Sequence, residues 1–249
     1  MKYFFYNSFV NILNQDEFLE CIEKSLAKPP SATTFFYLNS FSFYLSNKDN
    51  EFYKSLNGAD YINADGYSIV FILNWKYGVD IKKVGITYFF KDKLVHYFLA
   101  NRTRLYFLGA EKSVLDKALG KCRENYPELN IIGFREGYFD IIKETDSIIQ
   151  NINSSNPDVL IVGMGMPRAE IWINRNKTKI NVKCIISAGG FFDFLAEERK
   201  MAPSYFYSSG MEWIFRLIQE PKRLSLRYLK ANSYFIFKAV KLMFSKVKK

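Results

Sequence analysis

Short runs of apolar residues alternate along the chain with longer segments whose apolar positions recur every three to four residues. Most of the short runs lack the strict alternation of a half-exposed strand, so they predict strands that are covered on both faces. The predicted strands are Thr34–Asn39, Tyr61–Ala64, Arg104–Gly109, Asn130–Phe134, Asp158–Gly163 and Lys183–Ala188. The segments between them predict helices near residues 41–57, 67–78, 91–101, 112–126, 144–154 and 168–179.

This regular alternation of strands and helices indicates right-handed βαβ units. The predicted fold class is therefore α/β, with an open, mostly parallel, Rossmann-like sheet and helices on both faces. Such sheets bind ligands at the carboxyl ends of their strands. The pattern changes near residue 195, beyond which Pro203, Pro221 and two helical segments follow. We predict an α/β domain over residues 1–195 that holds the ligand site, and a helical appendage over residues 196–249.

The composition of the chain and the positions of its cysteines and histidine argue against several classes of protein. The chain has 249 residues, of which 49% are hydrophobic and 24% charged, and this excludes a globally disordered chain. Cys21, Cys122 and Cys184 are far apart, and the single histidine, His96, lies in a predicted helix. These positions argue against a disulfide framework, a zinc site and a histidine-based triad, and they favour a reducing cytosol. We also expect no signal peptide and no membrane span.

The net charge of +10 is concentrated at one end of the chain. Nine basic residues and no acidic residue follow Glu220, whereas residues 1–220 hold 26 basic and 25 acidic residues. A tail of one sign predicts a polyanionic partner.

At about 100° per residue, one side of the tail helix is basic and the other apolar. The basic stripe consists of Arg223, Arg227, Lys230, Lys238, Lys241 and Lys248. The apolar face consists of Leu229, Phe235, Ile236, Ala239, Val240, Met243 and Val247. This pattern is typical of a helix lying in an anionic membrane surface. A core-packed helix or a contact within a homo-oligomer is the competing interpretation.

A nucleic-acid-binding protein is a second interpretation of the basic tail. However, the tail aromatics lie opposite the lysines, so bases could not stack on them while phosphates were held. We therefore expect no nucleic-acid partner.

The segment Asn63-Ala64-Asp65-Gly66 follows a predicted strand and opens a predicted helix. A carboxylate at the end of this strand would face the ligand crevice, where Asp65 could act as a general base. The competing interpretation is that Asp65 only caps the next helix.

Two further segments place glycines at strand ends. Gly163 and Gly165, followed by Pro167, would allow a phosphate to approach the next helix, although a tight turn alone also explains them. Gly189 and Gly190 end the last strand. Asp193 follows among aromatics, where we favour a structural role.

Arg216, Arg223 and Arg227 are spaced by seven and four residues, which would place them on one helix face. Clustered guanidinium groups suit a diphosphate, although a solvated basic face has the same pattern. The chain contains no D-x-D motif, the usual metal clamp for a sugar diphosphate.

Taken in order, these segments resemble the WecG/TagA/CpsF family of bacterial glycosyltransferases. The matching motifs are Leu38-Asn39, Asn63-Ala64-Asp65-Gly66, Gly137-Tyr138-Phe139, Gly163-x-Gly165-x-Pro167 with Glu170 and Trp172, Gly189-Gly190-x-Phe192-Asp193-Phe194, Ala202-Pro203, Glu212-Trp213-x-x-Arg216 and Glu220-Pro221-x-Arg223-x-x-x-Arg227-Tyr228.

The resemblance implies a metal-independent, inverting transfer of a sugar, usually from a UDP-sugar, to a lipid-linked acceptor in cell-envelope or exopolysaccharide synthesis. It implies a cytoplasmic, peripheral enzyme at the inner face of the cell membrane, with no cofactor. It makes Asp65 the general base and the tail arginines the groups that complete the active site. The substrate-binding positions that it implies are Asn39, Asn63, Tyr138, Gly163, Gly165, Pro167, Gly189, Gly190, Arg216, Arg223 and Arg227.

The chain departs from the family pattern at three places. Ala169 replaces a usual glutamine, and the segments Gly85–Tyr88 and Met201–Pro203 replace Thr-Gly-x-Asp and Arg-Ala-Pro. Because of these departures the donor sugar is not assigned. An alternative interpretation is that the protein is a catalytically inactive scaffold of the same fold.

Overall fold

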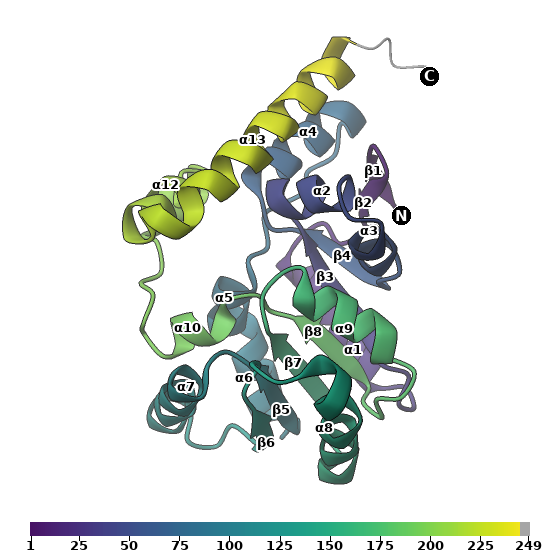
Figure 1. Cartoon of the computed structure of the whole chain (residues 1–249), viewed down its shortest axis with the longest axis vertical. Helices are drawn as coiled ribbons and strands as arrows, with labels where there is room; N and C mark the ends of the chain where they lie inside the picture. Colours follow the sequence, from purple (N-terminus) through teal and green to yellow (C-terminus); the bar gives the residue numbers. More distant parts are fainter. Residues whose placement is uncertain (245–249) are drawn as a thin grey trace.

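The computed structural model describes residues 1–244, which form a parallel six-stranded sheet with helices on both sides (Figure 1). The strand order is β4-β3-β8-β7-β5-β6, and every neighbouring pair is parallel. The strands are β3 (Thr33–Leu38), β4 (Tyr61–Ala64), β5 (Leu105–Gly109), β6 (Ile131–Arg135), β7 (Val159–Gly163) and β8 (Cys184–Ser187). Each coincides with a predicted strand to within one residue at either end. The predicted α/β fold class is therefore confirmed.

The body also contains helices that largely follow the prediction. They are α1 (Gln15–Leu26), α2 (Ser40–Ser46), α3 (Asn50–Asn57), α4 (Tyr67–Tyr77), α5 (Ile86–Phe89), the π-helical turn η1 (Phe90–Leu94), α6 (Val95–Ala100), α7 (Lys112–Asn125), α8 (Ile141–Ser155), α9 (Arg168–Asn176) and α10 (Phe191–Leu195). The single helix expected near residues 41–57 is wrong. Asp49 interrupts it, because its side chain caps a separate helix by accepting hydrogen bonds from the N–H groups of Glu51 and Phe52.

Alternate residues of each strand enter two different cores, one on each face of the sheet. Phe36 and Leu38 of β3 pack with side chains of α2, α3, α4 and α9, whereas Phe35 and Tyr37 pack with those of α1, α5 and α10. Continuous apolar strands bury both of their faces in this way.

An antiparallel hairpin of β1 (Tyr3–Phe5) and β2 (Ser8–Val10) precedes the sheet and was not predicted. It contacts the opposite end of the chain. The ring of Phe5 lies 5.0 Å from that of Phe235, and the Tyr6 hydroxyl donates a hydrogen bond of 2.8 Å to the Lys238 carbonyl oxygen.

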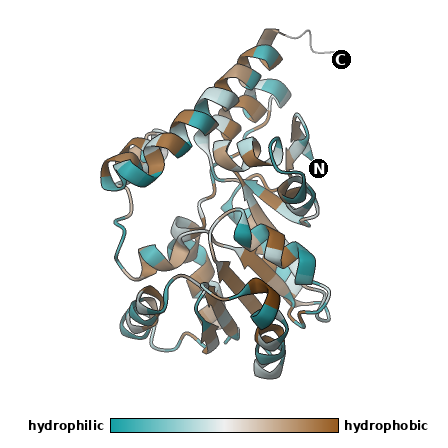
Figure 2. Cartoon of the chain, in the orientation of Figure 1, coloured by the Kyte–Doolittle hydropathy of each residue, from teal (hydrophilic) through white to brown (hydrophobic). Residues whose placement is uncertain are grey.

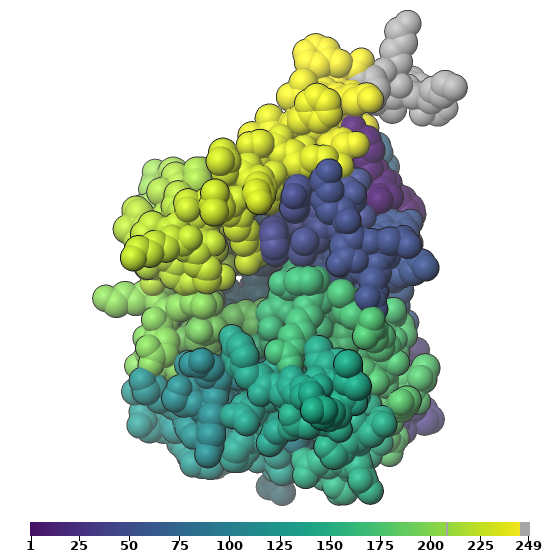
Figure 3. All heavy atoms as spheres, in the orientation of Figure 1, coloured from purple at the N-terminus to yellow at the C-terminus, as the bar shows by residue number. Residues whose placement is uncertain are grey.

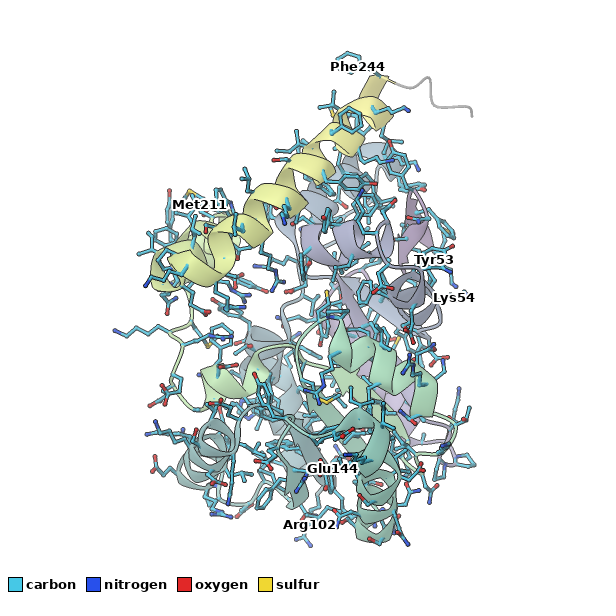
Figure 4. All side chains as sticks on the ribbon, viewed as in Figure 1. Tyr53, Lys54, Arg102, Glu144, Met211 and Phe244 are labelled. Carbon is cyan, nitrogen blue, oxygen red and sulfur yellow. The ribbon has the colours of Figure 1, made fainter. Side chains whose placement is uncertain are left out.

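The predicted helical C-terminal segment is confirmed. It consists of α11 (Ser204–Ser208), α12 (Glu212–Gln219) and the long α13 (Pro221–Phe244). Figure 4 labels Met211 at the start of α12 and Phe244 at the far end of α13, where that ring points away from the body. Among residues 1–244, no helix has the length and apolar character needed to cross a membrane.

Hydrophilic and hydrophobic residues are mixed along α13, as Figure 2 shows, and the hydrophobic ones divide into a buried part and an exposed part. Phe235 and Ala239 are buried and join the core of the body. Leu229, Ile236 and Val240 are exposed. The core-packed interpretation therefore holds for one side of the helix only. Val247 and Lys248, which the sequence pattern also included, lie outside the described residues.

Candidate active site

A cavity of about 400 Å³ lies across the carboxyl ends of the strands, under the C-terminal helices. The space-filling view in Figure 3 shows a hollow between these helices (yellow) and the green part of the body. The predicted site residues that line the cavity are Asn39, Asp65, Tyr138, Gly163, Gly165, Gly189, Gly190, Arg216, Arg223 and Arg227. Strand ends thus form its floor, and α12 and α13 supply its cationic roof.

Asp65 follows β4 directly and does not act as a helix cap. The N-cap of α4 is Gly66, which carries no side-chain cap, so the capping interpretation is wrong. Burial raises the pKa of the Asp65 carboxyl to about 6, against the lowering effects of Lys83 and Arg216 and of a hydrogen bond from Asn39. A carboxyl with this pKa can accept a proton near neutral pH.

Asn39 connects the start of α2 to Asp65. Its side-chain oxygen accepts hydrogen bonds of 3.0 Å from the N–H groups of Phe41 and Ser42 and thereby caps α2. The Asn39 side chain also lies close to the Asp65 carboxyl and lowers its pKa. The cap thereby fixes the position of this side chain beside the candidate base.

A buried ion-pair network joins α12 to the body beside Asp65. Glu212 accepts hydrogen bonds from Lys83 and, at 2.5 Å, from the Arg216 guanidinium. Burial alone would raise the pKa of Glu212, but Arg216 and Lys83 hold it below its ordinary value. Lys83 also lies 4.0 Å from the centre of the Tyr207 ring.

Arg227 is a largely buried cation with no carboxylate within ion-pair distance among residues 1–244. Its guanidinium stacks on the Phe41 ring at 3.8 Å, and its Nε has no hydrogen-bond partner. Its pKa is lowered to about 10, mainly by burial. Arg223 and Arg216 act in the same direction, while Tyr228 and Asp65 oppose them. An unneutralised guanidinium on a cavity wall indicates an anionic ligand.

The two glycines of the Gly163-to-Pro167 turn have different roles. A Cβ at Gly163 would lie 2.6 Å from the Phe192 ring, so this glycine permits close packing of β7 against α10. Gly165 has φ +75 and open space where a Cβ would be. The space beside Gly165 is therefore available to a ligand.

Two predicted site residues lie away from the cavity. Asn63 is fully buried within the sheet, where its side chain donates a 2.7 Å hydrogen bond to the Val84 carbonyl oxygen. Pro167 precedes α9 and is not part of the lining. Ala169, at the family's glutamine position, is buried in the core. Asp193 forms an ion pair of 3.3 Å with Arg199, in keeping with the structural role favoured for it.

Sequence reasoning missed three polar side chains at the site. Tyr37 and Glu170 line the cavity and are almost fully buried, yet the Tyr37 hydroxyl and Glu170 Oε2 have no hydrogen-bond partner within residues 1–244. The other carboxylate oxygen of Glu170 accepts a 2.7 Å hydrogen bond from Ser187. Lys83 lies outside any helix or strand and reaches Asp65 only through the fold. The sequence did hold one indication of Tyr37, because it lies two residues before Asn39 in the same predicted strand.

A second cavity, of about 540 Å³, opens on the other side of Asp65, between α4 and α13. Both cavities are lined by Asn39, Asp65, Arg216 and Arg227, which form the boundary between them. Arg223 lines only the first cavity.

A crevice at the ends of parallel strands, a proton-accepting carboxylate and converging arginines define an α/β enzyme for a phosphate-bearing substrate. Comparison with known proteins identifies its family. The chain belongs to the WecG/TagA/CpsF family of glycosyl transferases, whose family model matches residues 4–249.

Three relatives show the extent of this similarity. One from Bacillus subtilis (strain 168) is 26% identical over 212 residues, which cover 84% of this chain and 80% of the relative. One from Staphylococcus aureus (strain MW2) is 28% identical over 187 residues, which cover 75% and 71%. One from Bacillus spizizenii is 27% identical over 168 residues, 68% of this chain and 64% of that relative's length. All three are named N-acetylglucosaminyldiphosphoundecaprenol N-acetyl-beta-D-mannosaminyltransferase.

Proposed function

We propose that this protein is an inverting glycosyltransferase that moves a sugar from a UDP-sugar to a polyprenyl-diphosphate-linked acceptor. The observation that carries the proposal is the convergence of Asp65, Arg216, Arg223 and Arg227 on one cavity. Family membership and the lipid-linked acceptor in the names of the relatives support it.

The chemistry follows from the positions of these groups. Asp65 takes the proton from a hydroxyl of the acceptor as that oxygen attacks the anomeric carbon of the donor sugar. The bond between this carbon and the donor diphosphate breaks, and its electron pair leaves with UDP. A single displacement of this kind inverts the anomeric configuration.

The arginines stabilise the charge that develops on the leaving diphosphate. Arg223 lies on the donor side, since it lines only the first cavity. Arg216 and Arg227 lie at the boundary, where the transferred sugar passes from donor to acceptor. In this proposal the guanidinium groups do the work that a metal ion does elsewhere, so transfer proceeds in excess EDTA.

We also propose that α13 rests on the anionic cytoplasmic face of the membrane. Its exposed Leu229 and Phe244 would enter the lipid boundary, while the exposed Lys230 and Lys241 would meet anionic headgroups. This arrangement would bring the cavities to the lipid-linked acceptor.

The decisive test is Asp65→Asn, compared with Asp146→Asn on the exposed side of α8. We expect Asp65→Asn to abolish sugar transfer to a polyprenyl-diphosphate acceptor while calorimetry still detects UDP-sugar binding. Because the folded-state pKa of Asp65 lies above 3.8, its ionised form disfavours folding above about pH 6. The melting temperature of Asp65→Asn at pH 7.5 should therefore equal or exceed that of the unaltered protein.

Full activity in Asp65→Asn would refute the assignment of the base. If the unaltered protein transfers nothing from a panel of UDP-sugars, the inactive-scaffold alternative is favoured instead. The control Asp146→Asn should match the unaltered protein in every measurement, because Asp146 is exposed and pairs with Lys179 at the surface.

A further inference from the structure

Helix α4 has an apolar surface on all sides, yet only one side is covered. Its inner side, with Ile69, Ile72 and Leu73, is buried in the core. On its outer side Phe71 is 59% exposed and Trp75 is 45% exposed. A helix that is apolar all round is normally buried. The outer side of α4 is therefore suited to an apolar partner.

The exposed side of α13 faces this surface across the second cavity. Ile236, Val240 and Met243 of α13 form one wall of this groove, and Phe71 of α4 forms the other. Phe235 and Ala239, also part of the lining, are buried in the core beneath it. Figure 1 shows the two helices adjacent to each other at the upper end of the molecule.

The charged side chains of the groove gather at the end that borders the first cavity. They include Asp65, Lys83 and Glu212, with the cations Arg216 and Arg227 at the boundary to the first cavity. The outer end, between Phe71 and Met243, is apolar. The groove therefore suits a ligand with an anionic head and an apolar tail.

We propose that this groove holds the first isoprenoid units of the acceptor lipid, an inference that rests on the proposed function. The acceptor sugar would lie at Asp65, and the prenyl chain would run outward between α4 and α13. The acceptor diphosphate would lie on the groove side of Arg227, which borders both cavities and also faces the donor diphosphate. A volume of about 540 Å³ is that of a site for a drug-sized ligand, so it holds a segment of a long chain and not all of it.

The walls favour a lipid tail over a peptide. Both walls are helices whose backbone groups are hydrogen-bonded internally, so they offer no edge to an extended peptide. From Phe235 to Met243, the side chains that α13 contributes to the groove are all apolar, which matches a hydrocarbon chain.

The test uses Phe71→Gln and Val240→Gln, which place a polar group on either wall of the groove. Phe237→Gln is the matched control, because Phe237 is an exposed apolar residue of α13 that does not line the groove. Binding of farnesyl diphosphate and of inorganic diphosphate is measured by calorimetry at saturating UDP. Transfer is measured with a polyprenyl-diphosphate acceptor and with an analogue that carries a short alkyl chain.

We expect the unaltered protein and Phe237→Gln to bind farnesyl diphosphate at least tenfold more tightly than inorganic diphosphate. Both groove variants should lose most of this preference. Their KM for the polyprenyl acceptor should rise about tenfold, whereas kcat with the short-chain analogue and UDP affinity stay unchanged. Groove variants that keep the preference for farnesyl diphosphate, or a control that loses it equally, would overturn the proposal.

Failure of the proposed function gives a different result. If no acceptor is glycosylated but farnesyl diphosphate still binds through Phe71 and Val240, the groove is a lipid site and the transferase assignment is wrong. If transfer occurs and the groove variants use both acceptors as the unaltered protein does, the transferase assignment stands and the groove is not the lipid site.

Discussion

The floor and the roof of the first cavity are held in place by different kinds of contact. Asp65 and the glycine turns follow parallel strands that pair with their neighbours and bury both faces. The segment from α11 to α12 buries little apolar surface, and the buried residue of α12 is Glu212. Polar contacts fix this segment, including Glu212 with Lys83 and Arg216, and Arg199 with Glu220 at 2.6 Å. The candidate base thus follows a strand of the buried sheet, whereas Arg216 of α12 depends on a polar junction. Arg223 and Arg227 lie on α13, which also packs Phe235 and Ala239 into the core.

Among the changes that test this comparison of floor and roof, deletion of residues 196–249 should have the largest effect. The sheet and most of its two cores remain, but the buried Phe235 and Ala239 are lost, so we expect cooperative thermal unfolding by circular dichroism at a lower temperature. Transfer should fall below detection because all three arginines are lost, and sedimentation with anionic liposomes should be lost as well. Retained transfer would show that the roof is dispensable, and retained sedimentation would show that another surface contacts the membrane.

A smaller disturbance of the roof is Arg227→Met, with Lys230→Met on the same helix as the control. Removing a preorganised donor to developing charge typically costs about a hundredfold in kcat. We expect a loss of that order in Arg227→Met. With an acceptor dispersed in detergent, where membrane contact plays no part, we expect no change in Lys230→Met, whose side chain is exposed. Steady-state kinetics with a saturating donor measure the effect. Equal activity in the two variants would remove Arg227 from the mechanism.

Removing the charge of Glu212 from the polar junction with Lys83 and Arg216 should lower kcat moderately and change its pH dependence. Asp65 must be ionised to accept a proton, so kcat of the unaltered protein should fall as pH drops through about 6. The charge of Glu212 raises the pKa of Asp65, so Glu212→Gln should move this acid limb to lower pH. We also expect a several-fold loss of kcat at pH 7.5, because Arg216 loses its partner.

The pH–rate profile of Glu212→Gln is best compared with that of Glu128→Gln, an exposed position for which we expect no change. An acid limb that stays in place, or moves to higher pH, would show that Glu212 does not act on Asp65 electrostatically.

The smallest expected effect concerns the floor of the first cavity. The Tyr37 hydroxyl is buried at the cavity without a hydrogen-bond partner, so a substrate hydroxyl or phosphate oxygen would satisfy it. Tyr37→Phe should raise the donor or acceptor KM a few-fold and leave the melting temperature unchanged or slightly higher. Unchanged kinetics would show that the hydroxyl meets no substrate.

The difference between the strand-borne floor and the helical roof of the first cavity also explains which residues could be predicted from sequence. The strands and Asp65 follow from local patterns, because continuous apolar runs predict buried strands and ligands bind at their ends. Arg216 and Arg227 could be named from their spacing, but not the groups around them. Lys83 and Tyr207 come from segments without a local signal, and the fold alone brings them to Glu212.

Two outcomes show the limits of motif reasoning at single residues. Asn63 belongs to a matching motif, yet its place in a strand turns it into the sheet, where it binds the Val84 carbonyl. Asp65 precedes a helix as a cap would, but Asn39 and the nearby cations engage its carboxylate instead. In both cases the partner comes from a distant part of the chain, which the local sequence does not contain.

The contact between the β1–β2 hairpin and α13 bears on how the active site is assembled over time. The hydrogen bond from Tyr6 to Lys238 spans 232 positions, and contacts with such separations form late because closing the loop is entropically costly. During synthesis the strands and Asp65 are made long before α13, so the sheet can fold while Phe5 still lacks its cover. We therefore expect Asp65 to be in place before the arginines. If the proposed function holds, a newly made molecule would pass through a folded stage that lacks the arginines, and would gain capacity for transfer when α13 docks.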